Sequence, residues 1–361
     1  MIMVDVLGWD IGGVNVKTAL IKTWNGSVKE LKTATQYFPI WKRGKEQLPA
    51  VLDRLRNEVA GSIKLDAVGI TMTAELSDVY WTKREGVNHV LDCIEEVFVN
   101  IPIFVLDAEA NLRSVEEARH EPLKVAAANW PATGWMVSQL IKDCIIIDTG
   151  STTTSIIPVI DGNIATAGRT DLEKLLNGEL IYTGSLRTNV ATIVSFIPIK
   201  GGVARVSSEL FAQSGDVHLI LGNIKEDDYT IETVDGRGKT RMEAMARLAR
   251  VVCADIEMLT EQEIVEIAYY VYEKQVKQIS EGLTQVYNRI KLYLKENIPV
   301  VVTGLGRNFL AKKAAQKAGF NWIIDLGGLL DASATVASPS VGVALMVASE
   351  LEGKVVQWKR L

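Results

Sequence analysis

The first part of the chain alternates between hydrophobic and polar residues, and later parts follow helical spacing. Residues 4–11, 14–23 and 28–38 alternate in the manner of strands, and Asn25-Gly26 marks a turn between the last two. Strands are predicted over 67–71, 102–106 and 322–326, the first of them of a buried type. Helices are predicted over 46–59, 86–99, 123–141, 242–257, 308–318 and 338–351, and one long helix or two over 261–296. Strands and helices that alternate along a chain in this way predict an α/β fold.

The first two strands meet at a pair of glycines. The apolar run ends in Asp10, Gly12 and Gly13 follow, and Asn15 and Lys17 lie in the strand that resumes. Glycine permits positive φ and lets backbone N–H groups approach an anion closely. We therefore predict a tight hairpin whose five named residues bind phosphate or a metal ion, Asp10 being also a catalytic candidate. An ordinary N-terminal hairpin is the structural alternative.

A similar plan recurs in two later stretches. Residues 145–158, IIIDTGSTTTSIIP, form a strand that ends in Asp148, a turn and a second apolar strand. Residues 299–307, PVVVTGLGR, form a buried-type strand that runs into two glycines. Asp148 and Asp10 are therefore candidate metal ligands, and the candidate phosphate-binding residues of these stretches are Gly150, Ser151, Thr152, Thr153, Gly304 and Gly306.

The three motifs resemble, in order and spacing, the two phosphate hairpins and the adenosine-loop strand of the actin, sugar kinase and heat-shock protein superfamily. The resemblance implies two actin-like (ribonuclease H-like) domains with a central cleft. Residues 1–142, joined by the C-terminal segment 338–361, would form the first domain, and residues 143–337 the second. The stretch that follows residues 178–188, up to about residue 235, looks irregular and is too long for a plain connection, so we expect a substrate-specific insertion at about 165–240.

Polar residues follow the ends of two predicted strands of the first domain. Thr71, Thr73 and Glu75 come after one strand, and Asp107 and Glu109 come after the next. Ligands of open α/β sheets lie outside the carboxyl ends of the strands. We expect the threonines to contact substrate and the acids to include a general base or a metal ligand. Capping of loops and helices by the same side chains is the alternative.

Other candidates for substrate binding lie farther along the chain. Asn129 and Trp130 precede Pro131, which is expected to kink or interrupt the predicted helix 123–141. The insertion and its surroundings contribute Tyr182, Arg187, Asp235 and Arg237. Arginine can clamp an anionic group through two parallel hydrogen bonds. A packed tryptophan and solvated surface arginines are the alternatives.

Composition narrows the classes of function. The 361 residues are 48% hydrophobic, which is enough for about two domains, and the net charge is −5. Without a run of Lys and Arg, this charge argues against nucleic-acid binding. No apolar stretch is long enough to cross a bilayer, and no basic segment precedes the first apolar run. We expect a cytoplasmic protein with small-molecule substrates; its oligomeric state, a homo-oligomer included, stays open.

The cysteines and histidines add no site of their own. Cys93, Cys144 and Cys253 are widely spaced, each among apolar residues, and are expected to be reduced core residues. The three histidines show no metal-ligand spacing.

Longer blocks resemble one family closely. They are TMTAEL, AAANWPATGW, DTGSTTTSIIP, GELIYTGSLRT, FAQSGDVHLILG and TVDGRGKTRMEAMARLARVVCAD. These blocks lie within residues 7–307 and are similar to the hydantoinase/oxoprolinase-related proteins of the tetrahydromethanopterin and methanofuran C1 pathway of archaeal methanogenesis. One departure is Ser155, where the pattern of the family leads us to expect Asp. If that Asp assists metal binding in the family, Ser155 weakens the role here.

The resemblance implies a transferase rather than a kinase. It implies that 5-(aminomethyl)furan-3-ylmethyl diphosphate is coupled to the phenol of γ-glutamyltyramine, which yields the aryl ether APMF-Glu and diphosphate. Mg²⁺ is the expected cofactor. ATP is not required for this reaction, and whether the protein binds ATP stays open. The alternative is an ATP-dependent small-molecule kinase or a hydantoinase/oxoprolinase-like ATPase on the same hairpins. A third reading is a non-catalytic actin-like nucleotide-binding protein.

Overall fold

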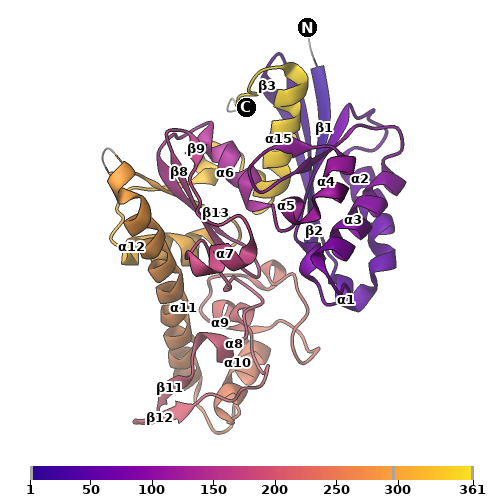
Figure 1. The fold of residues 1–361 in the computed structure, drawn as a ribbon. Helices are drawn as coiled ribbons and strands as arrows, with labels where there is room; N and C mark the ends of the chain where they lie inside the picture. The colour runs from indigo at the N-terminus through magenta and orange to yellow at the C-terminus, as the bar shows by residue number, and fades with distance from the viewer. Residues whose placement is uncertain (1–2, 295–296, 359–361) are drawn as a thin grey trace.

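Two β-sheets organise the computed structural model, which describes residues 3–294 and 297–358 (Figure 1). The first sheet has the order β3-β2-β1-β4-β5-β6, and the second has the order β10-β8-β7-β13-β14, with β9 paired to β8. The strands of the first sheet are β1 (Met3–Ile11), β2 (Asn15–Trp24), β3 (Ser27–Tyr37), β4 (Ala67–Met72), β5 (Ile103–Leu106) and β6 (Leu112–Arg113). Those of the second are β7 (Cys144–Thr149), β8 (Thr154–Ile160), β9 (Asn163–Ile164), β10 (Leu180–Ile181), β13 (Val300–Thr303) and β14 (Ile323–Asp325).

Both sheets are built to one plan. β1 pairs antiparallel with β2 and parallel with β4, and β7 pairs antiparallel with β8 and parallel with β13. The two glycine turns therefore lie at the carboxyl ends of β1 and β7, the strand ends at which α/β proteins bind ligands. The three strands predicted over 4–38 are confirmed as β1, β2 and β3, with bounds that differ by one residue.

Helices cover both faces of the first sheet. α2 and α3 pack on one face around a core that includes Trp9, Leu52 and Val90, and α15 packs on the other. Gly8 permits the close approach of α15, because a Cβ atom there would lie 2.0 Å from the carbonyl oxygen of Ser340. The helices of this part are α1 (Ile40–Arg43), α2 (Leu48–Val59), α3 (Lys83–Val97), α4 (Val115–His120), α5 (Pro122–Val125), α6 (Trp130–Ser138) and α15 (Ser338–Glu352).

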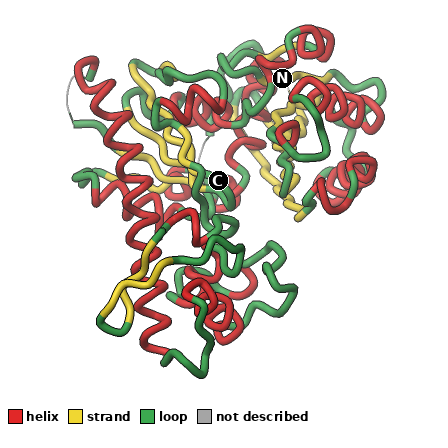
Figure 2. Tube along the Cα trace, turned by 60° about the horizontal axis from the view of Figure 1, so that its bottom comes forward, coloured by secondary structure: helices red, strands yellow, loops and turns green. Residues whose placement is uncertain are grey.

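The second sheet packs on α11, a helix of 30 residues that continues into a lower lobe (Figures 1 and 2). This lobe holds the two-stranded ribbon of β11 (Phe196–Ile199) and β12 (Gly202–Arg205), and many loops. The helices are α7 (Asp171–Leu176), α8 (Val190–Ile193), α9 (Ser214–Ile220), α10 (Arg241–Ala249), α11 (Glu261–Ile290), α12 (Lys312–Lys317), α13 (Leu326–Leu329) and α14 (Ala332–Val336). Within the described ranges, no helix combines the length and the apolar character needed to cross a membrane.

The predicted helix 123–141 is wrong as a single element. The structure has α5 and α6, separated at residues 126–129, where Ala127 adopts a left-handed conformation with φ of 55°. Pro131 lies in the first turn of the second helix, where a proline needs no partner for its missing N–H, and the interruption comes before it. The break places Asn129 and Trp130 at a helix start.

Other predicted elements differ at their ends. α3 begins at Lys83 rather than at Gly86, because the Thr82 side chain caps its first turn. α10 ends at Ala249 rather than at Glu257, and α11 is one helix that ends at Ile290. The predicted end at Glu296 lies outside the described residues.

Two further expectations need correction. The stretch from residue 189 to about residue 235 is not irregular throughout, since it contains α8, α9 and the β11-β12 ribbon. Cys253 is exposed rather than a core residue, in a left-handed conformation just after the turn that follows α10, whereas Cys93 and Cys144 are buried free thiols.

Candidate active site

The two glycine turns have the same backbone geometry and face each other. The N–H of Gly12 donates to the carbonyl of Asn15 at 3.0 Å, and the N–H of Gly150 donates to the carbonyl of Thr153 at 2.9 Å. The Asn15 side chain also donates to Ser151 Oγ at 3.4 Å, which joins the two turns directly. The sequence placed these turns 138 residues apart, and the fold brings them together at one cleft.

Each hairpin carries a carboxylate opposite a defined cross-strand neighbour, and Asp10 is buried whereas Asp148 is half-buried. Asp10 faces Lys17, whose Nζ lies 3.6 Å from Oδ2, and Asp148 faces Ser155. Asp148 also accepts a hydrogen bond from Thr133 at 3.3 Å. Because Ser155 is the direct neighbour of Asp148, an Asp at position 155 would have placed a third carboxylate at the cleft.

The two carboxylates suit a cation between the hairpins. Burial raises the pKa of Asp10 despite Lys17, and burial together with the charge of Asp10 raises the pKa of Asp148 to about 6. Oδ1 of Asp10 is buried and has no hydrogen-bond partner among the described residues. These residues contain no cluster of three or more His, Cys, Asp or Glu side chains for a metal. A Mg²⁺ ion fits such a pair, because it keeps several waters and binds through one or two carboxylates and substrate phosphates.

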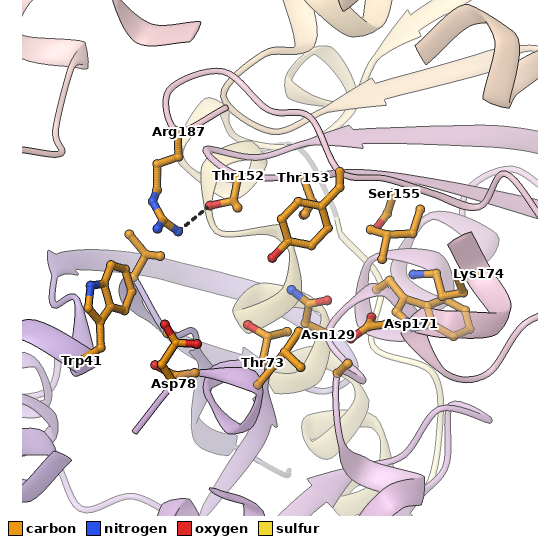
Figure 3. A pocket seen from close by; sticks show the side chains of 18 residues that line it. Trp41, Thr73, Asp78, Asn129, Thr152, Thr153, Ser155, Asp171, Lys174 and Arg187 are labelled. Atoms are coloured by element: carbon orange, nitrogen blue, oxygen red, sulfur yellow. Dashed lines mark hydrogen bonds between the residues drawn. The ribbon is translucent and has the colours of Figure 1, made fainter. Parts of the chain in front are cut away.

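Two adjoining cavities of about 310 Å³ each open beside the hairpins. The first, here called the hairpin cavity, is lined among others by Asp10, Asn15, Lys17, Asp148, Gly150 and Gly304. The second, here called the arginine cavity, is lined among others by Trp41, Thr73, Asp78, Tyr182 and Arg187 (Figure 3). Both are lined by Asn129, Trp130, Thr153 and Ser155, which form a shared wall.

Most predicted site residues lie on these walls. The two cavities bring together Asp10, Gly13, Asn15, Lys17, Thr73, Asn129, Trp130, Asp148, Gly150, Ser151, Thr152, Thr153, Tyr182, Arg187 and Gly304. Gly12, Thr71, Glu75, Asp107, Glu109, Asp235, Arg237 and Gly306 do not line either cavity. Thr71 supports the shared wall from behind, since its hydroxyl donates to the carbonyl of Ala128 at 2.6 Å.

Asp107 and Glu109 lie away from the cleft. Oδ1 of Asp107 accepts from the N–H groups of Glu109 and Asn111 at 2.9 and 2.8 Å, and Oδ2 accepts from Arg113 at 2.8 Å. These bonds organise the turn after β5, which is the capping alternative considered for this residue. Glu109 lines a separate cavity of about 190 Å³.

Asp235 and Arg237 make their ion pairs within the segment 235–250. Asp235 pairs with Arg247 at 3.3 Å and with Arg250 at 3.4 Å. The exposed Arg237 lies 3.9 Å from Asp235. Neither side chain is brought to the hairpins.

Glu75 is a buried carboxylate beneath the floor of the arginine cavity. It lies in a 3₁₀ turn (Ala74–Leu76) whose neighbours Thr73 and Leu76 line that cavity, and it is 2% exposed. Neither carboxylate oxygen has a hydrogen-bond partner among the described residues. Burial raises the pKa of Glu75 to about 7, and the nearby backbone of Glu75 and Ala127 and the charge of Lys83 offset only part of this effect.

This burial predicts a pH-dependent stability. The folded state holds the Glu75 proton to about pH 7, whereas the unfolded chain releases it near 4.5, so the free energy of unfolding should fall as pH rises between these values. The change is about 3 kcal/mol. Glu75→Gln should remove this pH dependence. In denaturant unfolding, the stability of the variant relative to the wild type should therefore be higher at pH 8 than at pH 5. If wild type and variant differed in stability by the same amount at both pH values, the Glu75 carboxylate would be solvated or paired.

Lys174 and Asp171 are site residues that sequence analysis missed. Both line the arginine cavity, and Lys174 is 1% exposed, with its Nζ 4.4 Å from the centre of the Trp130 ring. The sequence signal is a capping box, Thr170 to Glu173, which indicates a helix start. Nothing in the sequence indicates that the lysine of this short polar helix is buried.

Several contacts link the two parts of the chain. Lys83 of α3 pairs with Asp171 of α7 at 3.1 Å, and Lys42 pairs with Glu232 at 2.8 Å. The Arg187 guanidinium lies 4.9 Å from the centre of the Trp41 ring, and it donates to Thr152 at 3.4 Å (Figure 3). Residues 171–187 therefore line one cavity together with residues of both hairpins.

The fold is α/β, with two actin-like domains around a central cleft. Acetone carboxylase in its nucleotide-free structure shares it, with a TM-score of 0.52, 11% identity, and coverage of 95% of this chain and 70% of that one. Residues 66–348 match the family model of hydantoinase/oxoprolinase, and the chain belongs to this family.

Two curated relatives bear the same name. The "(4-{4-[2-(gamma-L-glutamylamino)ethyl]phenoxymethyl}furan-2-yl)methanamine synthase" of Methanocaldococcus jannaschii is 39% identical over 96% of this chain and 98% of its own length. The synthase of that name from Methanococcus vannielii is 37% identical over 60% of this chain and 97% of its own length.

Proposed function

We propose that this protein is a transferase of methanofuran biosynthesis that joins 5-(aminomethyl)furan-3-ylmethyl diphosphate to the phenol of γ-glutamyltyramine. The product is an aryl ether, and diphosphate is released. The observation that carries the proposal is the near full-length similarity to the Methanocaldococcus jannaschii synthase, whose name describes such an ether. Two adjoining cavities, one of them between the phosphate-type hairpins, are what a reaction between a diphosphate and a second substrate requires.

The hairpin cavity suits the diphosphate. Residues of both turns line it, and so does Lys17, whose ammonium could bind a diphosphate oxygen. Each hydrogen bond to a charged oxygen would contribute roughly 1.5–3 kcal/mol. Asp10 and Asp148 would hold Mg²⁺, which when bound neutralises charge on a departing diphosphate. An electron-rich furan stabilises the positive charge that develops on its methylene carbon, so stabilisation of the leaving group is the main task of these residues.

The arginine cavity suits γ-glutamyltyramine. Its walls include Trp41 and Tyr182, which can pack against the tyramine ring, and Arg187, which can bind the carboxylate of the glutamyl group. The phenol and the furan methylene would then meet at the wall formed by Asn129, Trp130, Thr153 and Ser155. A phenol ionises about three units above neutral pH, which costs about 4 kcal/mol, so a base must receive its proton during attack.

Replacing Arg187 by alanine should raise the KM for γ-glutamyltyramine. The guanidinium makes no ion pair with a carboxylate in the described part of the chain, and burial lowers its pKa, so an anionic ligand is the partner it lacks. Loss of a charged hydrogen bond predicts a change of roughly 10-fold or more. Initial rates with each substrate varied in turn would measure it.

Arg205→Ala is the matched control. Arg205 lies on the exposed ribbon strand β12, 5.6 Å from the centre of the Phe196 ring, and lines neither cavity. It should leave both KM values within about twofold, as surface substitutions usually do. If Arg187→Ala raised only the KM for the furan diphosphate, the carboxylate assignment would be wrong and Arg187 would belong to the leaving group.

We also propose the division of the chain into domains at 1–142 with 338–361 and at 143–337, of which residues 359–361 lie outside the described part. Each division holds one of the two large sheets. The insertion at about 165–240 would read the substrate, because it supplies Tyr182, Arg187 and Lys174 to the arginine cavity.

A cytosolic location is part of the proposal. Cys93, Cys144 and Cys253 are free thiols. Thiols persist in reducing compartments, where disulfides are rare.

The deciding experiment supplies purified protein with Mg²⁺, the furan diphosphate and γ-glutamyltyramine, with and without ATP. Diphosphate release and the mass of the coupled ether are both measured. Ether formed without ATP supports the transferase. Phosphate released from ATP, with no ether, would favour the second candidate, a hydantoinase/oxoprolinase-like ATPase or a kinase, which the family match supports.

A further inference from the structure

We propose that Lys174 is the base that accepts the phenol proton as the ether bond forms. The inference rests on the proposed function and deepens it, because it names the residue that activates the acceptor. Lys174 lines the arginine cavity and packs against Trp130, which lines both cavities. Its amine therefore lies beside the wall at which the two substrates would meet (Figure 3).

The amine of Lys174 has no polar partner within the described ranges. Its Nζ makes no hydrogen bond or ion pair there, and it lies 4.4 Å from the centre of the Trp130 ring. The two nearest acids are already engaged. Asp171 pairs with Lys83 at 3.1 Å, and Glu179 accepts from the N–H groups of Ala167 and Gly168 and from Arg289. A buried amine that makes no bond to its own fold is available to a ligand.

The backbone holds Lys174 in a fixed position. Its N–H donates to the carbonyl of Thr170 at 2.9 Å, and its carbonyl accepts from the N–H of Glu179 at 2.9 Å. Gly168 packs directly on this segment, since a Cβ atom at position 168 would lie 2.6 Å from the backbone nitrogen of Lys174. Hydrogen bonds and packing thus fix the backbone of α7 at Lys174, and a fixed backbone positions a reactive side chain well.

The surroundings keep a fraction of the amine neutral near pH 7. Burial lowers the pKa of Lys174 to about 7, while the charges of Asp171, Glu179 and Asp148 act in the opposite direction. A base whose pKa lies near the working pH combines a populated neutral form with useful basicity. The carboxylates predicted as bases are placed less well, because Glu75 lies below the cavity floor and Asp107 is bonded to Arg113.

The step balances without a further reactant. The bond between the furan methylene and the diphosphate oxygen breaks, and its electron pair leaves with diphosphate. A lone pair of the phenol oxygen forms the new carbon–oxygen bond, and the proton of that oxygen passes to Nζ of neutral Lys174. The resulting ammonium returns its proton to solvent or to the departing diphosphate.

The test compares wild type with Lys174→Met and Lys174→Arg in single turnovers at saturating substrate, from pH 5.5 to 9. The wild-type rate should rise with pH and level off above about pH 7. Both variants should lose roughly 100-fold or more, because neither side chain accepts a proton in this range. The residual rate of both variants should no longer rise near pH 7. Acceptors with fluorinated phenols, which are more acidic, should restore part of the rate of Lys174→Met.

Two controls separate the explanations. Lys274→Met removes a lysine that lies 5.0 Å from the Tyr270 ring centre and lines neither cavity, and it should change nothing. Glu75→Gln should keep the rise near pH 7, which assigns that titration to Lys174. A Lys174→Met variant with a cooperative thermal transition, a rate within threefold of wild type and an unchanged pH profile would overturn the inference. Absence of ether with the wild type would instead refute the proposed function, and the inference with it.

Discussion

Asp10→Asn should abolish ether formation and leave the fold intact. Asp10 is 4% exposed at the carboxyl end of β1, and one of its oxygens is without a partner among the described residues. As half of the proposed cation site it acts on the charge that develops on diphosphate, so its loss should lower kcat by roughly 1,000-fold or more. Removal of a buried charge whose pKa is raised by burial should keep or increase the melting temperature.

The measurement pairs turnover with thermal unfolding and with diphosphate binding in the presence and absence of Mg²⁺. In the variant, Mg²⁺ should no longer strengthen diphosphate binding. Asp5→Asn is the control, because Asp5 lies on the same strand, also has a raised pKa and a buried oxygen without a partner, and sits at the far end from the hairpin. Activity within tenfold of wild type for Asp10→Asn would remove Asp10 from the metal site.

Gly304→Ala should both destabilise the protein and inactivate it. Gly304 has φ of 85°, and a Cβ atom there would lie 2.4 Å from the carbonyl oxygen of Thr149 and 2.6 Å from Oδ1 of Asp148. The left-handed conformation costs an alanine about 1–2 kcal/mol. Overpacking costs typically 1–3 kcal/mol more, so the loss of unfolding free energy should be about 2–5 kcal/mol. Displacement of Asp148 should reduce turnover well beyond the loss of folded protein.

Gly319→Ala separates strain from crowding. Gly319 has nearly the same φ, 90°, but no atom lies within 4 Å of its would-be Cβ. It should therefore lose only the conformational part, about 1–2 kcal/mol, and keep its activity. Denaturant unfolding and turnover of the two variants give the comparison. If Gly304→Ala and Gly319→Ala lost the same amount of stability and of activity, the contact of residue 304 with Asp148 would have no effect.

Local patterns in the sequence were enough to predict the hairpins and most of the elements. Alternation over residues 4–38 predicts β1, β2 and β3, because side chains of a strand point to opposite faces in turn. The glycines after Asp10 and Asp148 predict where the strands turn back. Repetition of one motif also predicts that Asp10 and Asp148 share a cleft, since both motifs end a strand in the same way.

Tertiary structure decided which polar residues reach that cleft. Asp107 follows a strand just as Glu75 does, yet Arg113 and two backbone N–H groups occupy its carboxylate. The break at 126–129, which turns Asn129 and Trp130 into the wall between two cavities, likewise depends on packing.

Lys174 shows most clearly what the sequence alone does not predict. Its sequence context, a capped helix of six residues, is that of a solvated lysine. It is buried against Trp130, and Glu179, which bonds to its backbone carbonyl, comes from another segment of the chain. Periodicity and turn chemistry are properties of neighbouring residues and can be read from the sequence. The burial of a charge depends on segments far apart in the chain, so only the folded structure determines it.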